Sequence, residues 1–580
     1  MTSHQQFKHI ALSALLAGAL PVAAHAQTIG YGGFEGGASG GASASAAGDA
    51  SAASDSGEGS KRSGHRGRGG RNGSYIAPYI EAEQVVTRDF SPIDETVTYT
   101  SLAAGVDATI AGRNNAVSLS VRYERRIGYG NGRDGDTISG IARGYASVVP
   151  HAVQIDAGVL AAHTSVDGNN GSISSIGSIE GPGKVFAAYA GPTVSTHAGS
   201  AKVDAHYRIG YTKIDSNDEA VTTPDGVFGS DTFDKSVVHD AGVHIGTRPG
   251  AGFPVGIGAG AGFYQEDVSN LDQRVRDFHA RADILVPVAQ DLALVGGVGY
   301  EDVKISARDA VRDSNGIPVT QNGRFVTDKS QPRIDAFDAH GLIWDAGVVW
   351  RPSRRTQLEA HVGRRYGTTS YFGSFAYAPN DRSSLHISVY DNVAGFGGQL
   401  NRALAALPAE FTAIRDPISG NIGGCVASLK EGNCLAGAFG SLRSATFRAR
   451  GVNANYSMNF GRTQAGIGLG YDRRKFIAAP GTVLAIANDV VDENFWAVAY
   501  LNGQISRKSS YSFDVHANWF RTGSAFDSDA TAFGATLAYY HNLTSHLSAR
   551  AALGVDGISR PEPFDDQWSA SALAGLRYTF

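Results

Sequence analysis

From Tyr75 to the carboxyl terminus, apolar and polar residues alternate along nearly the whole chain. The stretch AVSLSVRYERRI, for example, places Val117, Leu119 and Tyr123 on one face and Ser118 and Glu124 on the other. A period of two is the pattern of a β-strand with one apolar and one polar face. About 22 such segments of roughly 10 to 15 residues follow one another, the length that a tilted strand needs to cross a bilayer.

The links between these segments are sorted by length. Every second link is a tight turn, and these turns lie near residues 112, 150, 198, 351, 379, 461, 507 and 542. The intervening links are mostly long, as at 167–183, 215–235, 307–336, 394–442 and 477–492. Short turns at one rim and long loops at the other are typical of outer-membrane barrels, whereas a soluble sandwich has no reason for this asymmetry. We therefore predict an all-β fold: a transmembrane antiparallel up-and-down barrel with both termini of the chain on the periplasmic side.

The last strand supports this fold class. WSASALAGLRYTF is apolar at every second position and ends on Phe580. Such a strand would close the barrel against the first strand, which removes both free edges. Its alternating aromatic end, with Tyr578 and Phe580, resembles the assembly signal that the outer-membrane insertion machinery recognises, so we expect that machinery to be a partner.

The amino-terminal region predicts export. Residues 1–26 have a basic start, a short apolar stretch and an A-x-A end, as a cleaved secretory signal has. Residues 27–74 are rich in Gly, Ala and Ser and end in the basic KRSGHRGRGGRNG, which predicts a disordered periplasmic leader. Its basic residues act either as a solvated linker or as an anchor to anionic envelope polymer; export argues against nucleic acid. The barrel is expected over 75–580, in the outer membrane and in contact with its lipid and lipopolysaccharide.

The strand phase also predicts which charges face the lumen. Positive and negative residues are interleaved on the inward positions, so the wall would either sort solutes by charge or form cross-strand ion pairs that stiffen it. The candidate pore-lining residues are Arg122, Glu124, Arg126, Asp204, Arg208, Arg281, Asp283, Asp345, Arg365, Asp472 and Arg474. We identify no catalytic residue, metal site or cofactor and expect no enzymatic activity.

The longest outer loop, 394–442, contains two local signals. Leu400, Leu404 and Leu407 have helical spacing and predict a short amphipathic helix that ends before Pro408. The only two cysteines, Cys425 and Cys434, are expected to form a disulfide in an oxidising compartment. Either the helix folds inward and narrows the lumen, or the loop is a surface hairpin that the disulfide protects from proteolysis.

Two stretches resemble a known family. GSYIAPYIEAEQVV with the hairpin after it, and GVVWRPSRRTQLEAHVGRRYG with the R-x-S-L strand after it, are similar to outer-membrane β-barrel proteins associated with exopolysaccharide and PEP-CTERM sorting systems of Gram-negative bacteria. The resemblance spans about 75–580, apart from the 394–442 insertion, and implies no catalytic residue. It implies a porin-like channel for exopolysaccharide export or solute passage, with polysaccharide as a partner.

Two alternatives remain at this point. One is a structural envelope protein whose outer loops bind surface polysaccharide. The other is a plug-less relative of the TonB-dependent transporters, a class whose barrels have about 22 strands. Members of that class need a folded plug before the barrel, and the segment from Thr28 to Gly73 is of low complexity.

Overall fold

A computed structural model describes residues 74–580, apart from 93, 131, 133, 168–169, 173–182, 216–220, 224–225, 229–231, 430–433, 525–528 and 563–564. The predicted signal peptide and nearly all of the predicted leader therefore lie outside the described residues. None of the helices in the described part of the chain is long and apolar enough to span a bilayer.

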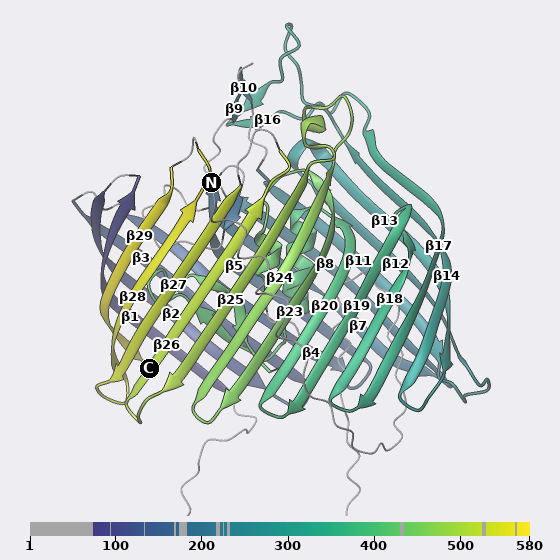
Figure 1. Cartoon of the computed structure of the whole chain (residues 1–580), viewed down its shortest axis with the longest axis horizontal. Coiled ribbons are helices and arrows are strands. Elements are labelled where there is room, and N and C mark those ends of the chain that lie inside the picture. The colour runs from purple at the N-terminus through teal and green to yellow at the C-terminus, as the bar shows by residue number, and fades with distance from the viewer. Residues whose placement is uncertain are drawn as a thin grey trace, which may run out of the picture.

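The chain forms one closed ring of antiparallel strands (Figure 1). The main sheet has 23 strands, of which 22 make the wall and the short β6 pairs only with the end of β5. The wall strands are β1 (Tyr75–Ser91), β2 (Glu95–Ala111), β3 (Asn115–Tyr129), β4 (Gly135–Val149), β5 (Val153–Asp167), β7 (Gly183–Ala198), β8 (Ala201–Asp215), β11 (Lys235–Thr247), β12 (Gly256–Val268), β13 (Gln273–Pro287), β14 (Leu292–Ala307), β17 (Ile334–Ser353), β18 (Thr356–Arg365), β19 (Thr368–Asn380), β20 (Ser383–Ala394), β23 (Thr446–Phe460), β24 (Thr463–Ile477), β25 (Val491–Gln504), β26 (Ser509–Arg521), β27 (Ala530–Asn542), β28 (Leu547–Ser559) and β29 (Gln567–Thr579).

The remaining elements lie in the links between wall strands. They are β6 (Asn170–Ser172), β9 (Val221–Thr223), β10 (Gly226–Phe228), η2 (Asn270–Asp272), β15 (Thr320–Gln321), β16 (Arg324–Phe325), α1 (Phe396–Ala406), β21 (Thr412–Arg415), β22 (Ile422–Ala427), η3 (Ala436–Phe439) and η4 (Val483–Ala487).

The ring closes where the sequence predicts, between the first and the last strand. β29 pairs with β1 from Tyr79↔Thr579 to Ser91↔Trp568. The backbone N–H of Phe580 donates to the carbonyl of Pro78 (3.0 Å). This pairing holds the carboxyl terminus and leaves no free edge in the sheet. The predicted all-β, 22-stranded, up-and-down antiparallel barrel is confirmed.

The sorting of link lengths also follows the prediction. On the rim where β1 begins and β29 ends, the links are short. The shortest include 199–200, with two residues, and the longest is 248–255, with eight. The links 216–234, 308–333, 395–445 and 478–490 all leave the other rim, although 269–272 and 366–367 are short links there. Figure 1 shows the tight turns at the bottom and the extended loops at the top.

The wall is apolar outside and polar inside. On β3, Val117 and Tyr123 are exposed while Ser118, Arg122 and Glu124 are buried. Exposed aromatic side chains lie near both ends of the strands, at the short-turn rim and at the opposite rim, with exposed Leu, Ile and Val between them. Examples are Trp350, Phe460, Tyr539, Tyr578 and Phe580 at the first rim and Phe90, Tyr129, Phe495, Trp519 and Trp568 at the second. Aromatic girdles flanking an aliphatic band match the two interfaces and the core of a bilayer.

Deleting Phe580 tests the role of the terminal residue. Phe580 is 66% exposed, so its ring packs little of the folded barrel, and its loss should affect assembly more than stability. We expect less folded protein in the outer membrane with unchanged secretion, measured as the fraction that runs faster unboiled than boiled on a detergent gel.

Phe460→Ala provides the matched control, because it removes another exposed aromatic ring from the same rim. An equal loss of folded protein in both variants would show that the terminal position has no special role.

Candidate functional site

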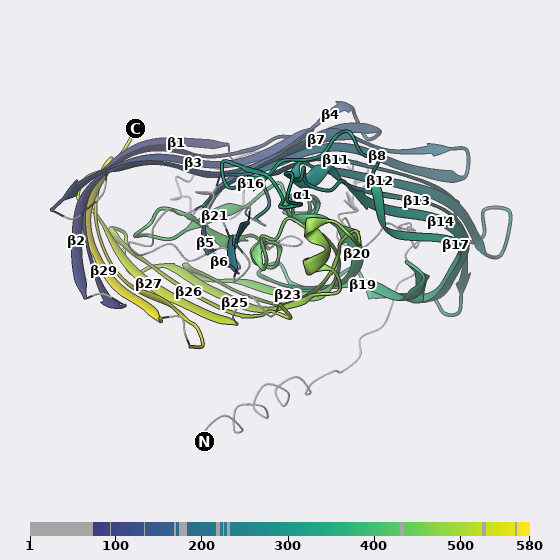
Figure 2. The same cartoon turned by 90° about the horizontal axis from the view of Figure 1, so that it is seen from above.

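The lumen is occupied by the described residues, 395–429 and 434–445, of the link between β20 and β23. Seen from above, the ring is a flattened oval, and α1 and β21 lie inside it (Figure 2). The loop therefore folds inward, as the first of the two sequence-based alternatives has it, and is no surface hairpin. Three parts of this segment contact different parts of the wall: the helix α1, the hairpin β21–β22 and the short helix η3.

The helix α1 docks by its apolar face. Phe396, Leu400 and Leu404 are fully buried in one cluster with wall residues such as Leu160 of β5 and Val185 of β7. Burying each of these large side chains contributes about 1.5–3 kcal/mol. The predicted helix is present and ends before Pro408, but it begins earlier than Leu400.

Two glycines let the first turn of α1 lie against the wall. A Cβ at Gly398 would overlap the hydroxyl of Tyr264, and one at Gly397 would overlap the hydroxyl of Ser236. Glu266 of β12, which is fully buried, accepts the backbone N–H groups of Gly395 (2.6 Å) and Gly398 (2.9 Å). A carboxylate at this position satisfies unpaired N–H groups and is favoured by the helix dipole.

The hairpin β21–β22 crosses the lumen from one long wall to the other. On one side, Arg415 donates to the hydroxyls of Ser120 (3.0 Å) and Ser139 (2.7 Å) on β3 and β4. On the other side, the hydroxyl of Thr536 on β27 donates to Asp416 (2.6 Å). Cys425 of β22 is joined to Cys434 by a disulfide, which packs beside Trp496 of β25.

The last part of the segment is held by an arginine. Arg474 of β24 donates to the backbone carbonyls of Gly437 (2.9 Å), Ala438 (3.1 Å) and Ser441 (2.7 Å), and to Asp472 (2.5 Å). Asp472 also accepts from the side chain of Gln399 on α1 (3.5 Å), so two of the candidate pore-lining residues bind the inserted segment. The inserted segment is therefore bonded to the wall on several sides of the lumen.

Other candidate pore-lining residues pair with one another in buried networks. Arg122 donates to Glu81 (3.0 Å) and contacts Glu124, which also accepts from Arg126 (2.7 Å). Elsewhere on the wall, Arg281 binds Asp345 (2.7 Å) and Asp283 (3.1 Å). The pairs Arg122–Glu81 and Arg281–Asp345 each reach across one intervening strand, the others lie along a single strand, and together they leave little unbalanced charge on the inner face.

Arg365, Asp204 and Arg208 complete the predicted set. Arg365 binds Asp277 (2.8 Å) and lies 3.5 Å from Glu301. Asp204 lies closer to the short-turn rim, where it accepts from Ser195 (2.8 Å) and Lys202 (2.9 Å). Arg208 is half-buried on β8, and no described residue bonds its Nε atom. The structure thus places the predicted set on the inner face but gathers it into separate clusters.

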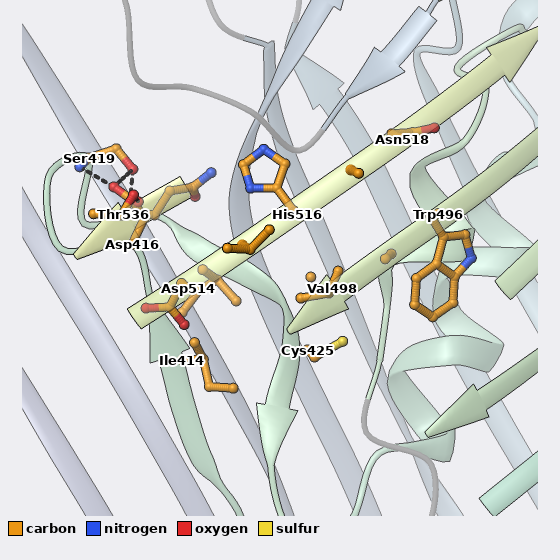
Figure 3. Close-up of a pocket in the computed structure, with 16 residues that line it drawn as sticks. Ile414, Asp416, Ser419, Cys425, Trp496, Val498, Asp514, His516, Asn518 and Thr536 are labelled. Atoms are coloured by element: carbon orange, nitrogen blue, oxygen red, sulfur yellow. Dashed lines mark hydrogen bonds between the residues drawn. The ribbon is translucent and has the colours of Figure 1, made fainter. Parts of the chain in front are cut away.

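A cavity remains between the hairpin and the wall strands β25, β26 and β27 (Figure 3). It is bounded on the loop side by residues including Ile414, Asp416 and Cys425. The wall side contributes Trp496, Val498, Asp514, His516, Asn518 and Thr536. No group of three or more His, Cys, Asp or Glu residues in the described parts of the chain is arranged to hold a metal ion.

The sequence-based selection missed several wall residues that contact the inserted segment or the cavity. Glu266, Asp514, His516 and Asn518 all stand at inward positions, and their strand phase was the available signal. These residues differ from other inward-facing residues because they lie next to the segment 395–445. Their proximity to it depends on how that long link folds. The phase of the strands carries no information on that.

Comparisons with known proteins identify no family. No protein-family model matches the sequence, and no curated protein is similar to it. Solved structures that are similar include the FrpB iron transporter of Neisseria meningitidis (F5-1 variant, apoprotein form), with 10% identity, a TM-score of 0.39, and 87% of this chain and 81% of that chain covered. The ferric-catecholate import receptor Fiu of E. coli K12 in its open form has 11% identity and a TM-score of 0.40, with 88% and 82% covered. At these values the similarity carries no argument about function, and neither structure bears on the exopolysaccharide and PEP-CTERM association.

Proposed function

We propose that this chain is an outer-membrane transport barrel whose lumen is closed at rest by its own segment 395–445. The observation that carries the proposal is the insertion of this segment into a charged, polar lumen whose outer wall has the apolar face of a membrane barrel. A purely structural barrel needs neither a wide polar lumen nor a segment that fills it. Ring size agrees, because 22-stranded outer-membrane transporters have an obstructed lumen whereas smaller porins are open.

The contacts of the segment suggest how it opens. The helix α1 is held by a large apolar cluster. The hairpin β21–β22 contributes Ile422 and Val426 to that cluster and packs Ile414 against Tyr500, and it is held in addition by hydrogen bonds to serine, threonine and backbone groups. A single such bond contributes about 0.5–1.5 kcal/mol net. In our proposal the hairpin moves aside, which opens a passage for small hydrophilic solutes.

Deleting Leu400 to Cys434 should raise permeability on the order of tenfold or more, because even 16–18-stranded barrels leave an aqueous channel when nothing fills them. Swelling of liposomes in isotonic sugars and amino acids measures this directly. The wall ladders β20–β23 and β24–β25 contain none of the deleted residues, so the barrel should still fold.

A second deletion, of residues 313–326, serves as the matched control, since it shortens another link at the same rim that stands above the barrel (Figure 1). It should leave swelling unchanged. If removal of Leu400 to Cys434 also leaves swelling unchanged in folded protein, the transport proposal is wrong and a structural envelope role is favoured.

A further inference from the structure

One buried carboxylate in the lumen lacks a partner. Asp514 lies on the inner face of β26 and lines the cavity beside the hairpin (Figure 3). Neither of its carboxylate oxygens is in contact with solvent, and neither accepts a hydrogen bond from any described residue. Removing a carboxylate from water without a counter-charge or hydrogen-bond donors is strongly unfavourable.

Other buried carboxylates of the wall are compensated. Asp345 binds Arg281, Asp277 binds Arg365, and Asp492 binds Arg443 at 3.1 Å. Among the described residues that line the cavity, by contrast, none is Arg or Lys. The cavity instead contains a second carboxylate, that of Asp416, so the local charge is negative.

Two other polar atoms that line the cavity also lack partners among the described residues. Nε2 of His516 and Oδ1 of Asn518 are shielded from solvent and form no hydrogen bond with any described residue. These two side chains follow Asp514 at every second position of β26, so all three lie in one row on the inner face. The carboxylate and amide oxygens are hydrogen-bond acceptors. A ligand that donates hydrogen bonds would therefore satisfy them.

Apolar side chains complete the cavity. Ile414 of the hairpin, Val498 and Trp496 line it together with the polar row. They provide a surface for the carbon atoms of a ligand, and a Trp ring also attracts a nearby cation. Half of the lining comes from the inserted segment and half from the wall, so a ligand in the cavity would contact both.

We propose that this cavity binds the primary ammonium group of a small cationic solute, with Asp514 as its counter-charge. An ammonium group carries three N–H donors and a positive charge, which matches the unpartnered Asp514 carboxylate in a cavity that also contains Asp416. A metal ion fits less well because the described residues offer no cluster of three ligating side chains here. The site lies between the hairpin and the wall, and it can be tested whether or not the barrel conducts.

Methylammonium chloride is the probe, and potassium chloride at equal ionic strength is the comparison. Saturation-transfer NMR on the refolded full-length protein in detergent measures binding of the methyl group. We expect saturable binding of methylammonium that potassium does not displace. Asp514→Asn should weaken it roughly tenfold to a hundredfold, the range for loss of a charge-assisted hydrogen bond.

Two further variants keep the test decisive. Asp302→Asn removes an exposed carboxylate from the outer side of β14 and should leave binding unchanged. Ile414→Trp fills the cavity from the side of the hairpin and should also weaken binding, which covers the case in which Asp514→Asn fails to fold. Equal binding to wild type, Asp514→Asn and Ile414→Trp, or no saturable binding at all, would overturn the proposal and would leave the permeability result unaffected.

Discussion

Replacing Arg365 with methionine is expected to lower the free energy of unfolding of the barrel by about 3–5 kcal/mol, the cost of removing one partner from a buried ion pair. Arg365 is 3% exposed and binds Asp277 at 2.8 Å, with Glu301 at 3.5 Å. Methionine would leave both buried carboxylates without this cation. Denaturant unfolding of the refolded protein in detergent measures the change.

The neighbouring residue on the same strand gives a matched control. Arg364 points to the exposed side of β18, and Arg364→Met should change stability by less than about 1 kcal/mol, as expected for a surface charge. Equal losses in the two variants would mean that the inner charges do not stiffen the wall. Lower pH should recover part of the Arg365→Met loss, because protonated carboxyl groups need no counter-charge.

Placing aspartate at both Leu400 and Leu404 is expected to release α1 from the wall while the barrel stays folded. Both side chains are fully buried in the apolar cluster, and an unpaired charge there costs several kcal/mol. Tryptic cleavage after Arg402 or Arg415, identified by mass spectrometry, should accelerate on the order of a hundredfold or more, because proteolysis follows the population of the open form.

Ala406→Asp introduces the same charge on the same helix outside the cluster, at a half-buried position, and should change cleavage little. If the double aspartate variant is cleaved at the rate of wild type, the helix is not held by its apolar face.

The strands of the barrel wall could be predicted because the pattern that produces them is visible in each strand by itself. A strand between lipid and a polar lumen must alternate, so residues such as Val117 and Glu124 reveal their faces without any knowledge of their neighbours. Link length likewise reports the rim on which a link lies. Strand number, closure between the first and last strands and the inward phase all follow from these two signals.

Pairing of the inner charges could not be predicted in the same way. Arg281 and Asp345 meet although 64 positions separate them, because the register across β13, β14 and β17 brings them together. Alternation gives the face of each residue but not its height relative to other strands. The lack of a partner for Asp514 is therefore also invisible in the sequence.

The inserted segment was predicted in part. Leu400, Leu404 and Leu407 indicated an amphipathic helix, but Gly397 and Gly398 argue against helix by propensity, and the helix includes them. Close approach to Tyr264 and Ser236 outweighs this propensity. Tertiary contact decides here, and it depends on wall residues more than 100 positions away.

The most direct test of a lumen closed from within is the single-channel conductance of the intact barrel and of the barrel lacking Leu400 to Cys434, recorded in the same planar bilayer. We predict small or no steps for the intact protein and large, stable steps for the deletion, because the removed residues cross and fill the lumen. Equal conductance of the two folded proteins would contradict the account.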